Sequence, residues 1–177
     1  HPTVSIPELV RLLMNEGKSF DDALDIARRT FSYTNHTLMS EALETWDCEL
    51  FRSVIPNILD IIFRINDALH RELTSRGLPQ EKINSMYIVA DGRIHMARLA
   101  TFVSSYVNGV AQIHSGLLRT EVLKDWYDVY PERFQNKTNG VTQRRFLGLC
   151  NPALSTLIGS RIGYGFMTDL YELKKLE

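Results

Sequence analysis

Residues 48–77 contain the longest helical pattern of the sequence and constrain the fold more than any other feature. Apolar residues recur there every three or four positions, which places them on one face of a helix. Pro56 should begin or kink this helix, because proline has no backbone N–H to donate, and Gly77 should end it. In a chain of 177 residues, such a helix belongs in one domain with a sizeable core. The apolar positions are Ile58, Ile61, Ile62, Ile65 and Leu69.

The rest of the chain adds shorter elements. Residues 86–96 predict a β-hairpin, because β-prone residues flank an Asp-Gly turn. Ser19 is typical of a helix N-cap. The chain should be mostly helical, with one or two short strands that lack partners. We expect helices over residues 5–17, 19–34, 97–105, 112–126 and 151–163, and a short helix that begins at about residue 40. A strand is expected over residues 106–111. A polar loop from about 130 to 140 should lead into a further helix that ends near residue 150.

Composition excludes several classes of protein. Hydrophobic residues make up 44% and charged residues 23%, as in ordinary globular proteins. The formal net charge of −1 implies neither a nucleic-acid nor a membrane partner. Cys48 and Cys150 stand alone, which fits a reducing compartment and gives no metal or disulfide signal. Because there is no initiator methionine and the last residues follow a helical pattern, we expect the chain to be a piece of a longer protein.

His36, within "YTNHTLMSEALETW", raises the first question about function. It precedes the helix expected from about residue 40, so its local chemistry favours capping over substrate binding. Glu41 and Glu44 would be ordinary partners of the helix dipole. Tyr33 and Trp46 are amphipathic residues of the kind that line sugar sites.

Two more stretches are rich in candidate binding groups. In "YVNGVAQIHS", Gly109 allows either a close approach of the backbone to a ligand or a plain strand-to-helix corner, while His114 is better explained as a packed residue. In "FQNKTNGVTQRRFL", the polar residues 136–139 suit a polyhydroxyl ligand or form a solvated loop. His70, His95 and Cys150 show no metal spacing.

Taken together, "HPTVSIPEL", "YTNHTLMSEALETW", "YVNGVAQIHS", "FQNKTNGVTQRRFL" and "CNP" resemble the glycogen/starch (α-glucan, maltodextrin) phosphorylases. The resemblance runs along essentially the whole chain and covers an internal segment of such enzymes. It implies an α/β fold, the GT-B arrangement of two Rossmann-like lobes. Residues 1–138 would be the C-terminal part of the N-terminal lobe. Residues 139–177 would form the crossover and the first helices leading into the C-terminal lobe, and partners for the unpaired strands would lie outside this chain.

The resemblance also implies an activity. Phosphorylases cleave the terminal α-1,4 linkage of glycogen, starch or maltodextrin with phosphate and release glucose 1-phosphate. Pyridoxal 5′-phosphate takes part through its phosphate group. The implied parent enzyme is a cytoplasmic homodimer. Its cofactor lysine and the residues that hold substrate phosphate belong to the C-terminal lobe, so the isolated chain is expected to be inactive.

Site residues follow from the same resemblance. His36 would hydrogen-bond the 6-hydroxyl of glucose, and Asn139 would share this contact. Val110, beside Gly109, would line the same pocket close to sugar and cofactor. No catalytic residue and no metal ligand is assigned. Glu44 and His1 would line a side pocket beside the sugar ring.

Three positions depart from the family pattern. Ser40 stands where proline is common, and Gln143 stands where proline or another residue is frequent. Phe146 replaces the usual tryptophan near the cofactor. These changes concern chain-length preference and cofactor packing more than the reaction. Two alternatives stay open: a GT-B glycosyltransferase that uses a nucleotide sugar, and a non-catalytic helical glucan-binding or interaction domain.

Overall fold

The computed structural model describes residues 1–177 except for the side chain of Ser40, so the effect expected of serine in place of proline at this position lies outside the described residues. The chain divides into two compact units, His1–Thr138 and Asn139–Glu177. The assignment of these units to two lobes of a larger enzyme remains a prediction. In the described residues, the chain is mostly helical with small sheets, as expected.

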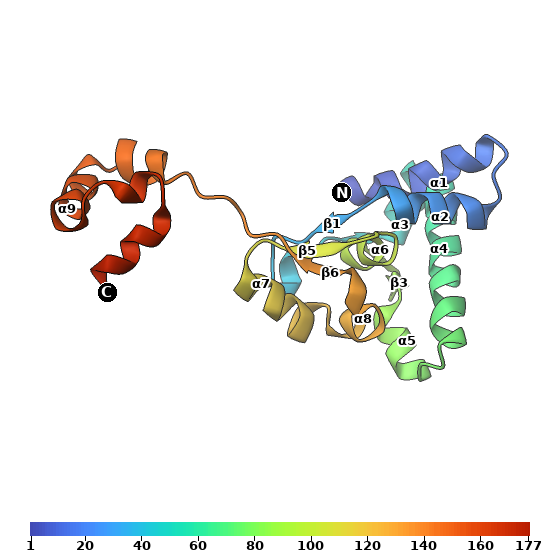
Figure 1. Cartoon of the computed structure of the whole chain (residues 1–177). Coiled ribbons are helices and arrows are strands. Elements are labelled where there is room, and N and C mark those ends of the chain that lie inside the picture. Colours follow the sequence, from blue (N-terminus) through green and yellow to red (C-terminus); the bar gives the residue numbers. More distant parts are fainter. The chain divides into compact units, whose positions relative to one another are not determined.

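The first unit is built around α4 (Pro56–Ser75), the longest helix in Figure 1. It begins at Pro56, as predicted, and a separate helix α3 (Cys48–Val54) precedes it. All five predicted apolar positions are buried. Other helices of this unit are α1 (Ser5–Asn15), α2 (Phe20–Thr30), α5 (Gln80–Met86), α6 (Met96–Phe102), α7 (Gln112–Leu117) and α8 (Lys124–Val129), with short helical turns at Pro2–Val4, Ser40–Ala42, Leu118–Val122 and Pro131–Arg133.

Helices α1 and α2 form a hairpin that packs on α4. The Ser19 Oγ accepts the Asp22 N–H at 3.1 Å, which confirms the predicted N-cap. Val10, Ala23 and Ala27 are fully buried against the core. The burial of these small and medium side chains lets the helices approach α4 closely.

A parallel sheet in the order β1-β5-β6 crosses the first unit (Figure 1). Its strands are β1 (Tyr33–Thr34), β5 (Val107–Gly109) and β6 (Phe134–Asn136). Tyr33 pairs with Val107, which pairs with Phe134. The expectation that the strands lack partners was therefore wrong, because β1 and β6 are defined by pairing with distant segments. The region read as a polar loop contains β6.

A second sheet, β2-β4-β3, contains the predicted hairpin. Strands β3 (Val89–Ala90) and β4 (Arg93–His95) are antiparallel, and both turn residues have positive φ: 51° at Asp91 and 72° at Gly92. Strand β2 (Thr45–Asp47) pairs with β4. The helix expected from about residue 40 was wrong: a 3-10 turn, Ser40–Ala42, leads into β2, so Glu44 is not on a helix.

The second unit comprises α9 (Pro152–Ile162) with turns at Arg144–Leu149, Gly165–Met167 and Leu170–Leu176. The predicted helix over residues 151–163 is confirmed. Phe166 is fully buried in this unit, and Ile158 is nearly so. The Gln143 side chain donates to the Met167 carbonyl at 3.1 Å and ties the unit's first turn to its later part.

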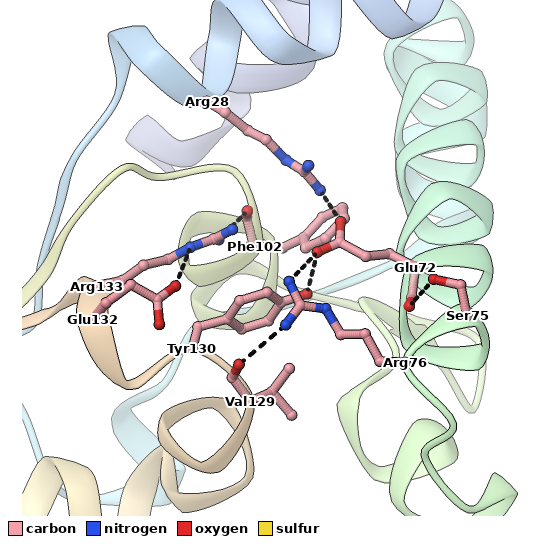
Figure 2. Close-up of polar contacts among 9 residues, drawn as sticks. All are labelled: Arg28, Glu72, Ser75, Arg76, Phe102, Val129, Tyr130, Glu132 and Arg133. Atoms are coloured by element: carbon pink, nitrogen blue, oxygen red, sulfur yellow. Dashed lines mark hydrogen bonds and ion pairs between the residues drawn. The ribbon is translucent and has the colours of Figure 1, made fainter.

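A cluster of charged and aromatic residues joins α2, α4 and the segment before β6 (Figure 2). At its centre, the Glu72 carboxylate accepts hydrogen bonds from Arg28 at 2.7 Å, from the Tyr130 hydroxyl at 2.8 Å and from Arg76 at 3.3 Å. We call these four residues, with Arg133, the Glu72 cluster. Arg133 stacks on the Tyr130 ring, with its guanidinium carbon 4.1 Å from the ring centroid.

Within the described part of the chain, no helix is long and apolar enough to span a bilayer. The described residues also include no group of three or more His, Cys, Asp and Glu side chains that is placed to hold a metal ion.

Candidate functional site

A cavity of about 440 Å³ lies along β1 and contains three of the predicted site residues, His1, His36 and Glu44. We call it the His36 cavity. Polar side chains of residues 32–37 share its lining with apolar side chains from α1 and α6. A mainly apolar wall with a few oriented polar groups is typical of small-molecule sites. Among the lining residues are Ile6, Phe31, Tyr33, Thr34, Asn35, Thr37, Leu43, Met96, Ala97 and Ser104.

Asn35 organises the turn that presents His36. Its side chain is 1% exposed, and its Oδ1 accepts the Thr37 N–H at 3.0 Å in an Asx turn. Its backbone N–H donates to the Asn108 carbonyl at 2.9 Å, which anchors the turn to β5. Sequence reasoning missed Asn35. The Asn-x-Thr spacing was an available signal, since an Asn side chain often bonds the N–H two residues on.

His36 is the second residue after β1, and its exposed side chain lines the cavity. The structure has a 3-10 turn in place of the expected α-helix, so there is no α-helix there for His36 to cap. Beside it, the Tyr33 hydroxyl accepts from Asn35 Nδ2 at 3.0 Å. Burial raises the pKa of this hydroxyl, so it keeps its proton and can donate it to a ligand.

Glu44 and His1 also line the cavity. The Glu44 carboxylate accepts a hydrogen bond from Trp46 Nε1 at 2.9 Å. Glu44 is held by β2, which follows it directly. The structure therefore brings His1 and Glu44 to one cavity with His36, whereas their proposed contact with a sugar remains a prediction.

Gly109 and Val110 lie at the carboxyl end of β5, the strand that pairs with β1, and do not line the His36 cavity. The carboxyl ends of parallel strands are the usual place for ligands in open α/β sheets. Here the Val110 N–H donates to His114 Nδ1 at 3.1 Å. His114 is thus a packed residue that holds the β5–α7 corner, in agreement with the sequence interpretation.

Gly109 is required by this corner. A Cβ atom at Gly109 would lie 2.6 Å from both His114 Nδ1 and Ser115 Oγ, and 2.9 Å from the Ser115 Cα. The last of these contacts is with backbone, which cannot turn away as a flexible side chain could. The approach of α7, rather than a ligand, therefore explains the glycine.

We expect Gly109→Ala to destabilise the first unit by about 1–3 kcal/mol, because the added methyl group forces α7 away from β5. Gly116→Ala is the matched control, because Gly116 lies in α7 and a Cβ atom added there would meet nothing within 4 Å. Urea unfolding followed by tryptophan fluorescence reports this unit, since both tryptophans, Trp46 and Trp126, belong to it. Equal unfolding midpoints for the two variants would contradict this account.

The loop after β6 is tied to the same helix. Ser115, which is 2% exposed, donates from its hydroxyl to Asn136 Oδ1 at 2.7 Å. Asn136 Nδ2 in turn donates to the Thr138 hydroxyl at 2.9 Å. Of the polar cluster predicted over residues 136–139, Asn136 and Thr138 are therefore used internally to shape the loop.

Asn139 and Phe146 belong to the second unit. Asn139 is exposed, and the Phe146 ring is 57% exposed. Their predicted roles toward sugar and cofactor remain predictions.

A second cavity of about 590 Å³ shares Glu44 with the first and contains His95, Arg98 and Trp126. Burial lowers the pKa of His95, with Arg98 and Arg93 adding to the effect. Arg98 donates to the Tyr87 carbonyl at 2.7 Å. Sequence reasoning gave none of these residues a site role, since only the pairing of β2 with β4 brings His95 beside Glu44.

The chemistry of the His36 cavity is that of hydroxyl recognition. Imidazole, amide, hydroxyl and carboxylate groups each donate or accept hydrogen bonds. Among the described residues that line the cavity, none is a lysine or an arginine. The cavity is therefore suited to an uncharged polyhydroxyl ligand and supplies neither a lysine nor an arginine as a partner for a phosphate group.

Comparison with known proteins agrees with the resemblance. A model of the carbohydrate phosphorylase family matches residues 1–177. The chain is 47% identical over 182 aligned residues to the brain form of glycogen phosphorylase from Bos taurus, covering 99% of this chain and 22% of that protein. It is 45% identical over 181 residues to the muscle form from Homo sapiens, again covering 99% of this chain and 22% of that protein.

The chain belongs to the carbohydrate phosphorylase family. It is similar to glycogen phosphorylases over nearly its whole length. It spans about a fifth of the length of these relatives, 22% in each case.

Proposed function

We propose that the full-length parent of this chain is an α-glucan phosphorylase and that this segment supplies part of its glucose-binding pocket. The parent would phosphorolyse terminal α-1,4 bonds of glycogen, starch or maltodextrin and release glucose 1-phosphate. The observation that carries the proposal is that His1, His36 and Glu44, up to 43 residues apart in sequence, line one cavity that has no lysine or arginine among its described lining residues.

In this proposal, His36 and Asn139 bind the 6-hydroxyl of glucose, and Tyr33 donates a further hydrogen bond nearby. Glu44 and His1 line a side pocket beside the ring, while Gly109 and Val110, which lie outside the His36 cavity, would contribute to the pocket from β5. The apolar wall formed by residues such as Met96 and Ala100 would pack against the sugar. All of these groups bind or orient, and none is assigned a proton transfer.

The cofactor of the family, pyridoxal 5′-phosphate, would supply its phosphate group to the reaction when bound to the parent. The described residues around the His36 cavity do not fit this group, because they include neither a lysine for its aldehyde nor an arginine or lysine for its phosphate. Phe146 would lie near the cofactor only in the complete enzyme. We place the parent in the cytoplasm as a homodimer, by analogy with the family.

The isolated 177-residue chain should therefore be inactive and should not bind pyridoxal phosphate covalently. After incubation with the cofactor and dialysis, its spectrum should contain no Schiff-base absorption band. Borohydride reduction followed by mass measurement gives an independent check. A stable adduct at one lysine of this chain would contradict the assignment of the cofactor site to the rest of the parent.

The experiment that tests the proposed activity compares donors in the parent protein. Purified parent is incubated with a maltooligosaccharide and either glucose 1-phosphate or a nucleotide-activated glucose. We expect the maltooligosaccharide to be extended with glucose 1-phosphate and not with the nucleotide-activated glucose. Extension only with the nucleotide sugar would contradict the proposed phosphorolysis and support the alternative, a glycosyltransferase that uses a nucleotide sugar. Glucan binding without extension would indicate a non-catalytic glucan-binding protein.

A further inference from the structure

A further cavity, lined by charged residues, lies at the end of the parallel sheet where its strands begin. A cavity of about 440 Å³ opens there between the end of α2 and the segments that enter β5 and β6. We call it the Arg133 cavity. Arg28, Arg29 and Arg133 line it, with Glu132 as the only acidic residue among the described lining.

Positive charge is in excess around this cavity, although Arg29 is paired with Asp25 at 2.9 Å. Glu72 is shared between Arg28 and Arg76, so one carboxylate serves two guanidinium groups. Arg133 forms only a long ion pair, with its Nε 3.9 Å from Glu132 Oε1, and its Nη1 donates to the Phe102 carbonyl at 3.2 Å (Figure 2). A guanidinium that is only 18% exposed is therefore left without a hydrogen-bonded carboxylate in the described structure.

The arginines are also held in place before any ligand binds. The guanidinium carbon of Arg28 lies 4.3 Å from the centroid of the Phe102 ring, and that of Arg133 lies 4.1 Å from the centroid of Tyr130. Burial lowers the pKa of the Arg133 guanidinium, and the positive charge of Arg28 acts in the same direction, while Tyr130, Glu72 and Glu132 partly offset them. Since an arginine stays protonated in proteins, an anion between the two groups would relieve their repulsion.

The remaining lining suits a phosphate and a group attached to it. The Ser104 hydroxyl lines the cavity and can donate to a phosphate oxygen, whereas the Ser105 hydroxyl donates its proton to the Arg28 carbonyl at 2.6 Å. Tyr106 contributes a ring that is 50% exposed. Arginine is the preferred partner of phosphate because its planar fork can give two parallel hydrogen bonds.

We propose that the Arg133 cavity binds a phosphate group, with Arg133 and Arg28 as its principal ligands and Arg29 at its rim. Free phosphate and a phosphate monoester share this chemistry. A monoester would place its organic part against Tyr106. The site does not depend on the activity proposed above, since it uses none of the residues of the His36 cavity except Ser104, which lines both.

Calorimetric titration of the 177-residue chain tests the proposal. The ligands are inorganic phosphate, phenyl phosphate and, as an uncharged control, phenol, in a buffer of low ionic strength. We expect one saturable site with a Kd below about 1 mM for at least one of the two phosphates, and no binding of phenol. Tighter binding of phenyl phosphate would assign the site to a monoester, and equal affinities would assign it to free phosphate.

Substitutions locate the binding. Arg133→Gln should weaken it about tenfold or more, and Arg29→Gln about threefold. Arg52→Gln is the matched control, because Arg52 is an exposed arginine in an ion pair on α3, outside the cavity. Arg29 is 70% exposed, so its variant remains informative if Arg133→Gln fails to fold. No saturable binding, or equal weakening by Arg52→Gln, would overturn the proposal.

Discussion

Replacing His36 with alanine in the parent should lower kcat/KM for phosphorolysis of maltoheptaose about a hundredfold or more, roughly 2.7 kcal/mol of transition-state stabilisation. A neutral imidazole can donate to or accept from a hydroxyl, and its removal leaves a buried hydroxyl unpaired. The effect is large because recognition of hydroxyl groups depends on a few oriented partners. Phosphate-dependent release of glucose 1-phosphate measures it.

Asn139→Ala should have an effect of similar size. If both side chains contact one hydroxyl, the double variant should lose less than the product of the two single losses, because the second removal finds the hydroxyl already released. His70→Ala is the matched control, since His70 pairs with the Tyr87 hydroxyl at 2.8 Å and does not line the His36 cavity. An active wild type with both site variants unaffected would exclude His36 and Asn139 from the sugar site.

Removing the central carboxylate of the Glu72 cluster should have the largest effect on stability. Glu72→Ala leaves Arg28, Arg76 and the Tyr130 hydroxyl without their shared acceptor, in a place where the Glu72 side chain is 22% exposed. We expect a loss of about 3 kcal/mol in the free energy of unfolding of the first unit. Urea unfolding followed by tryptophan fluorescence measures it.

The matched control is Glu49→Ala, which removes an exposed carboxylate paired with Arg52 and should cost less than about 1 kcal/mol. Equal losses for the two variants would show that the cluster does not stabilise the fold.

The pH dependence of stability gives the same cluster a second test. Burial favours the neutral form of Glu72, but Arg28, the Tyr130 hydroxyl and Arg76 together outweigh burial and hold its pKa below the ordinary value of 4.5. The unfolded chain therefore binds the proton more readily than the folded one. The stabilisation is present above pH 4.5 and is lost as the pH falls through the lower, folded pKa. In Glu72→Gln, this part of the acid-induced loss should be absent.

Much of the local structure could be predicted because its causes are local. Pro56 starts α4, Ser19 caps α2, and Asp91 with Gly92 forms the hairpin turn. Each depends on the chemistry of one or a few neighbouring residues.

The parallel sheet could not be predicted in this way. β1 is two residues long and is defined by pairing with β5, 74 residues away in sequence. The segment 134–136 looks polar, yet it is β6 because β5 offers it a partner. The same applies to Glu44: its neighbours favour a helix, but pairing of β2 with β4 overrides that preference.

For the candidate site, the residues themselves indicated only that His36, Gly109 and the polar stretch before Gly140 merited attention. The grouping of His1 and Glu44 with His36 came from the family resemblance, since no local pattern connects residues so far apart. The sequence interpretation missed Asn35, which is buried and organises the His36 turn. Its role depends on a tertiary hydrogen bond to the Asn108 carbonyl as well as on the Asx turn.

The central claim is that His36 binds the 6-hydroxyl of glucose in a phosphorylase. The most direct test measures kcat/KM of the parent in the direction of glucan synthesis, with glucose 1-phosphate and with its 6-deoxy analogue, for the wild type and for His36→Ala. We predict that the wild type loses about a hundredfold on the deoxy substrate and that His36→Ala loses several times less, because one of the two proposed partners of this hydroxyl is already missing. An equal loss in both enzymes would show that His36 does not contact this hydroxyl.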